Sequence, residues 1–109
     1  MPERPAKPKR PQQVFTLLVE VGRSAEDGLP EGAEGAGLLC YASGVDEAEA
    51  VRETVAILKQ AGMAPLDVTG HGSLAEREEA GEAIPAEERA LMDRALAENS
   101  VVVASVETF

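Results

Sequence analysis

The stretch "VTGHGSLAEREE", residues 68–79, contains the only histidine of the chain, His71, between Gly70 and Gly72. Glycines relieve backbone restrictions, so these two predict a turn between a strand and a helix. The imidazole would then lie near a helix N-terminus at the end of a strand, where α/β sheets tend to place ligands. We therefore treat Gly70, His71 and Gly72 as candidate ligand-binding residues. The alternative interpretation is a polar residue in a flexible corner.

A second candidate ligand-binding residue is Ser43, which precedes the first predicted helix together with Gly44. A helix N-terminus offers unpaired backbone N–H groups to an anion. Asp46 and Glu47, however, would repel that anion.

Catalytic chemistry has few candidates, and we expect no catalytic residue, no metal site and no cofactor. One histidine supplies neither a metal-ligand set nor a catalytic pair. Cys40, within a predicted strand, is interpreted as a small buried hydrophobe. A catalytic thiol would need His71 close in space, which requires both residues at one end of the sheet. Tyr41 is predicted on the opposite strand face from Cys40, packing with an exposed hydroxyl.

Length and charge narrow the class of protein. The 109 residues suit one domain. The net charge is −10, and residues 1–10 contribute +3, so the remainder carries −13. An acidic body repels phosphate backbones, so we expect no nucleic-acid partner for the folded part. A single cysteine fits a reducing compartment, and no apolar run approaches 18 residues, so we expect a cytoplasmic protein without a membrane partner.

The domain organisation follows from proline, glycine and hydrophobic periodicity. Residues 1–13 are predicted to be a mobile, basic, proline-rich tail, and residues 14–109 a single α/β domain with a flexible loop at 22–37. Alternating or apolar runs predict four strands, at 14–21, 38–42, 65–69 and 101–106. Helices are predicted after the capping residues Asp46 and Ser73 and from Pro85 to Asn99.

The element order β-β-α-β-α-β predicts an α+β fold: a two-layer α/β sandwich of four strands and two main helices, ferredoxin-like in the broad sense. Right-handed crossovers would place both helices on one side if the strands advance in one direction. The last strand, "VVVASV", is apolar on both faces. This pattern indicates a central strand or one buried by another subunit, and together with an apolar uncovered face it favours a homodimer.

These observations predict a small soluble acidic protein that acts as a non-enzymatic protein-interaction or accessory module. The alternative is a small-ligand-binding protein or minor enzyme with a site near Ser43 and His71.

Overall fold

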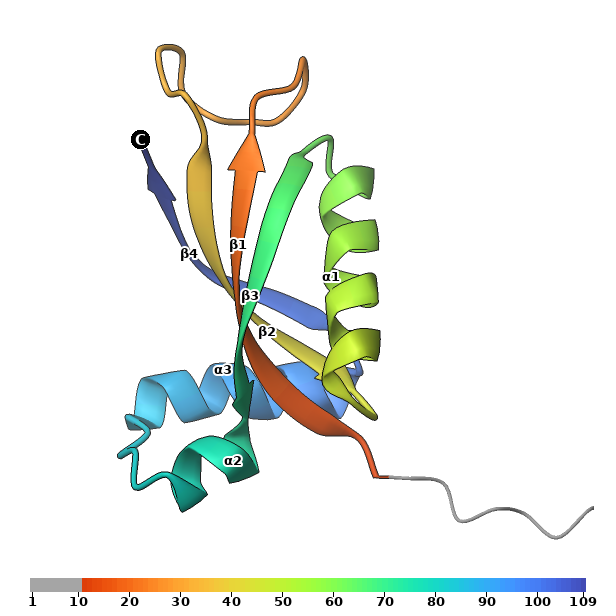
Figure 1. Ribbon diagram of the computed structural model, residues 1–109, viewed down its shortest axis with the longest axis vertical. Coiled ribbons are helices and arrows are strands. Elements are labelled where there is room, and N and C mark those ends of the chain that lie inside the picture. The colour runs from red at the N-terminus through yellow and green to blue at the C-terminus, as the bar shows by residue number, and fades with distance from the viewer. Residues whose placement is uncertain (1–10) are drawn as a thin grey trace, which may run out of the picture.

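The computed structural model describes residues 11–109, which form a small α+β domain with one four-stranded antiparallel sheet and three helices (Figure 1). The sheet order is β3-β1-β2-β4. Residues 1–10 of the predicted tail lie outside the described part. The elements, in chain order, are β1 (Gln13–Gly22), β2 (Ala36–Gly44), α1 (Glu47–Gln60), β3 (Ala64–Ser73), α2 (Leu74–Glu79), α3 (Ala86–Glu98) and β4 (Val101–Thr108).

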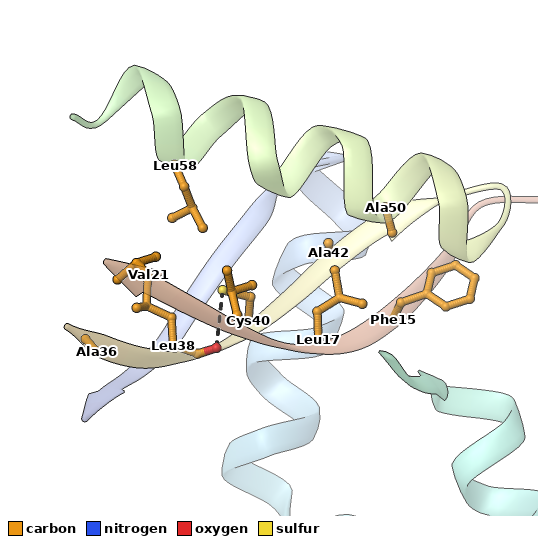
Figure 2. Close-up of a cluster of buried hydrophobic side chains, with 10 residues drawn as sticks. Phe15, Leu17, Val21, Ala36, Leu38, Cys40, Ala42, Ala50 and Leu58 are labelled. Carbon is orange, nitrogen blue, oxygen red and sulfur yellow. Dashed lines mark hydrogen bonds between the residues drawn. The ribbon is translucent and has the colours of Figure 1, made fainter. Parts of the chain in front are cut away.

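The helices cover opposite faces of the sheet. Successive side chains of a strand point to opposite faces. Leu17 and its alternate neighbours pack beneath α1, and we call this side the α1 face (Figure 2). Val14, on the other side, packs with Met92 and Ala95 of α3, and we call that side the α3 face. Both clusters are buried, so each helix layer contributes its own part of the core.

The predicted placement of both helices on one face is therefore wrong, and the ferredoxin-like order is not confirmed. The connection through α1 leads from β2 across β1 to the edge strand β3. The connection through α2 and α3 then returns across the whole sheet to β4 at the opposite edge. Because the strands do not advance in one direction, the crossover rule does not assign both helices to one side.

The predicted helix ends are confirmed. The side chain of Asp46 accepts a hydrogen bond of 2.8 Å from the Glu49 amide and caps α1. Ser73 and Glu76 form a reciprocal capping box at the start of α2, with bonds of 3.1 and 2.8 Å. Asn99 ends α3 in the left-handed conformation, with φ of 48°.

The inward side of α1 differs from the predicted apolar stripe, which was Ala48, Val51, Val55 and Leu58. The helix buries Ala50, Thr54 and Leu58, whereas Ala48 is exposed and Ile57 is 43% exposed. The hydroxyl of Thr54 donates to the Ala50 carbonyl at 2.8 Å, so it needs no water when buried. Leu58 and Val51 of the predicted stripe do pack in or against the core, so the stripe is confirmed in part.

The connector between β1 and β2 is organised around one buried carboxylate. Asp27 accepts backbone bonds of 2.8 Å from Ser24 and 2.9 Å from Leu29, which lower its pKa. Arg23 pairs with Asp27 at 2.9 Å and also donates to the Pro30 carbonyl. The flexibility expected at 22–37 stays a prediction, but the segment has a defined arrangement.

Candidate binding surfaces

Gly70, His71 and Gly72 lie at an irregularity of β3, a strand at the edge of the sheet. The His71 side chain is exposed. Gly70 lies directly against the Glu47 carboxylate of α1, because a Cβ there would overlap with its Oε1 atom. Gly72 has a φ of 95°, a conformation that favours glycine. Both glycines thus have a structural reason for their positions.

Ser43 lies near the end of β2 and is 5% exposed. Its hydroxyl oxygen is 2.9 Å from Gln12 Oε1 and 2.8 Å from Asn99 Oδ1. With one proton it can donate to only one of these amide groups. The residue lines a pocket of about 440 Å³ together with Gln12, Glu49, Glu53, Ile57, Asn99, Ser100 and Val101.

The structure does not bring the predicted site residues together. Ser43 belongs to β2 and His71 to β3, and β1 lies between these two strands. His71 is not among the residues that line the Ser43 pocket.

Cys40 and Tyr41 point to opposite faces of β2, as predicted. Cys40 is buried on the α1 face, and burial raises the pKa of its thiol to about 11. It is therefore a protonated, unreactive thiol at neutral pH. The predicted exposure of the Tyr41 hydroxyl is wrong, because Tyr41 is 2% exposed in the α3-face cluster.

A partly buried ionic cluster on the α3 face was not predicted from the sequence. Nη1 of Arg77, from α2, donates to Glu88 Oε1 at 2.6 Å and to Thr16 Oγ1 at 2.8 Å. Nε of Arg77 donates to Glu82 Oε1 at 3.0 Å. Glu88 also accepts a hydrogen bond from the Tyr41 hydroxyl. We call Thr16, Tyr41, Arg77, Glu82 and Glu88 the Arg77 cluster.

The electrostatics of the Arg77 cluster keep its groups in their ordinary neutral-pH forms. Burial raises the pKa of Tyr41 to about 12, and the Glu88 carboxylate adds to this shift. Burial also raises the pKa of Glu88, but the hydrogen bonds from Arg77 and Tyr41 outweigh it, so the pKa is lowered. The cluster thus ties α2 and α3 to β1 and β2.

The side of the sheet formed by β4 is incompletely covered. Val103 and Val106, on the α1 face, are 41% and 48% exposed. On the α3 face, a shallow pocket of about 430 Å³ is lined by Leu18, Gly37, Leu39, Ser105, Glu107, Thr108 and Phe109. The prediction of a central position for this strand is wrong, because β4 lies at the edge. Burial by another subunit, the other interpretation, stays a prediction.

A family profile described as a domain of unknown function, DUF8846, matches residues 14–109. The chain belongs to the DUF8846 family. No curated protein and no solved structure matches the chain.

Within the described range 11–109, the DUF8846 chain contains no group of three or more His, Cys, Asp or Glu side chains arranged to hold a metal ion. The same range contains no helix of sufficient length and hydrophobicity to span a bilayer. The polar groups of the Arg77 cluster bond to one another. Two surfaces of the described part of this DUF8846 domain are open to another molecule: the Ser43 pocket and the β4 side of the sheet.

Proposed function

We propose that the chain is a non-enzymatic protein-interaction module that forms a homodimer through the β4 side of its sheet. The observation that carries the proposal is the position of β4: a strand apolar on both faces lies at the sheet edge. Val103 and Val106 are each nearly half exposed there. Complete burial of one such half-exposed side chain contributes about 1 kcal/mol to the free energy of association. A symmetric dimer contains two copies of each valine, so this contribution is made four times.

Two further features support this proposal. Arg77, Glu82 and Glu88 bond within the Arg77 cluster on the α3 face, which supports a structural role for them. Cys40 is free and buried, in keeping with the cytoplasmic setting that we propose for the protein.

The proposal is tested by sedimentation equilibrium from about 1 to about 100 µM chain, the range in which micromolar dimers dissociate. We expect the wild-type mass to approach twice the 11.4 kDa of one chain as concentration rises. Val106→Lys should weaken the dimer by at least about tenfold, because it places a charge among apolar side chains.

The matched control is Leu66→Lys, at an apolar side chain of β3 that is 66% exposed. This variant should dimerise like the wild type. A wild-type mass of one chain at every concentration would contradict the proposal.

A second candidate function, small-ligand binding, is favoured by the pocket of about 440 Å³ beside Ser43. Its size is in the range of ligand sites. The buried serine hydroxyl and the Asn99 amide could orient a polar ligand, and Ile57 supplies an apolar wall.

A thermal-shift screen against metabolites, nucleotides and metal ions tests this second function. A ligand at about 100 times its Kd should stabilise the chain by roughly 2.7 kcal/mol, or several degrees. Ser43→Ala should abolish the shift and His71→Ala should retain it. A shift that survives in Ser43→Ala and disappears in His71→Ala would place the site at Gly70, His71 and Gly72 instead.

A further inference from the structure

We infer that β4 pairs in antiparallel fashion with β4 of a second copy along its full length, which joins two sheets into one of eight strands. This inference rests on the proposed homodimer and specifies its interface. It is carried by three features of the described chain: the chemistry of the two sheet edges, the face assignment along β4, and the position of its one charge.

The two edge strands differ in their protection against pairing. β3 contains Pro65, which has no backbone N–H, the exposed Asp67, two glycines and two register irregularities. Proline, charge and irregular register are the means by which proteins block an edge. β4 contains no proline or glycine, one charged residue, Glu107, and one irregularity. The edge that is open to strand pairing is therefore β4. The β4 strand of a second copy lacks the same blocking features, so it is a partner that can pair with it.

The irregularity in β4 fixes which side chains share a face. Leu39 lies opposite Ser105, and the next residue, Cys40, lies opposite Val103, so Ala104 is the extra residue of a bulge. Val103 and Val106 are on the α1 face, opposite Cys40 and Leu38. Ala104 packs in the α3-face cluster and Ser105 lines the α3-face pocket, so these neighbours share that face.

This assignment selects one register for a pair of β4 strands. In an antiparallel pair, side chains directly opposite each other must point to the same face. Full-length pairing of residues 101–108 places Val103 opposite Val106 of the second copy and Ala104 opposite its Ser105. Both pairs match in face. A shift by one residue would place Val103 opposite Ser105 of the second copy, which points to the other face. Full-length pairing therefore gives the greatest overlap of the two strands, and it also places opposite side chains on the same face.

The same register suits the side chains that it brings together. The exposed valines of both copies form one apolar group on the α1 face. The small residues Ala104 and Ser105 lie at the two-fold axis. Glu107 lies opposite Val102 of the second copy, so the two Glu107 carboxylates are at opposite ends of the strand pair and do not repel closely.

A mixed-cysteine experiment tests the pairing. One protein carries Val103→Cys and another Val106→Cys. Both proteins also carry Cys40→Ala. Cys40 lies opposite Val103 within one chain, so it could otherwise form an intramolecular disulfide with a cysteine at position 103. Opposite residues of an antiparallel pair fall within disulfide range, whereas two copies of position 103 would be three residues apart along the strand. We expect a covalent dimer on a non-reducing gel in the oxidised mixture and in neither protein alone.

The control mixture combines Val103→Cys with Leu66→Cys on the blocked edge, and it should remain uncrosslinked. Circular dichroism of each variant checks that it is folded. A cross-link in Val103→Cys alone, or none in the mixture although the wild type is a dimer, would overturn the pairing and leave the homodimer standing. A wild-type chain that stays monomeric would overturn both.

Leu18→Glu separates this interface from packing through the α3-face pocket. Leu18 is on β1, is 44% exposed and does not belong to the paired strand. Edge pairing predicts an unchanged dimer for this variant. Loss of the dimer in Leu18→Glu would instead assign the interface to the α3 face and overturn the inference.

Discussion

Replacing Arg77 with methionine is expected to lower the free energy of unfolding by about 3 kcal/mol, which is a large share of the stability of a domain of this size. The Arg77 side chain is 13% exposed and holds two carboxylates and the Thr16 hydroxyl. Its loss leaves the Glu88 carboxylate, 21% exposed, beside the buried Tyr41 without its cation. Urea unfolding followed by circular dichroism measures the difference.

The matched control is Arg89→Met, at the other arginine that joins α3 to α2. Arg89 pairs with Glu78, and the two side chains are 42% and 47% exposed. Exposed pairs contribute at most about 1 kcal/mol, so this variant should remain near the wild type. Equal losses in the two variants would contradict the structural role of the Arg77 cluster.

The Arg77 cluster also predicts a dependence on pH. The pKa of Glu88 is lowered in the folded chain, so its contribution to stability is complete above the unfolded value near 4.5. That contribution is lost as the pH falls below 4.5 through the folded value. Arg77→Met removes the main cause of the lowered pKa. Its unfolding free energy should therefore fall less steeply in acid than that of the wild type.

Local signals in the sequence predicted the element ends well. Capping by Asp46 and Ser73 and the left-handed Asn99 depend on residues within one turn of each other, so a single short stretch determines them. The predicted inward stripe of α1 was shifted because it ranked positions by hydrophobicity. Ala50 and Thr54 are buried instead, and the Thr54 hydroxyl is satisfied by the Ala50 carbonyl.

Long-range arrangement was harder to predict. The side on which each helix packs depends on strand order, and strand order is not encoded in any one segment. The Arg77 cluster was missed for the same reason, since Arg77 and Thr16 are 61 residues apart in the chain. One signal was present: Arg77 is the single basic residue among four glutamates between Ser73 and Glu87. A charge run of that composition is typical of a solvated surface, so it does not by itself indicate a partly buried arginine.

The candidate site was predicted in part. Ser43 does line a pocket, but His71 is exposed on another strand, and the sequence could not show that β1 separates them. The apolar character of β4 was evident from "VVVASV". Its position at the edge of the sheet became evident only from the strand order. An apolar strand indicates a partner only when it lies at an edge.

Two charged double variants of β4 are expected to differ in oligomeric state. Val103→Lys with Val106→Lys places lysine opposite lysine twice in the proposed register, and like charges directly opposite each other destabilise a strand pair. Val103→Lys with Val106→Glu places lysine opposite glutamate twice. The first variant raises the net charge of −10 by two and so reduces the overall repulsion between copies, whereas the second leaves it unchanged. Overall charge therefore works against the predicted difference.

Sedimentation equilibrium of these two double variants beside the wild type tests the central claim most directly. The account predicts masses near twice 11.4 kDa for the wild type and the lysine–glutamate variant, and near 11.4 kDa for the lysine–lysine variant at the same concentration. The same mass for both double variants, whether that of one chain or of two, would contradict the pairing of Val103 with Val106 across the β4 edge.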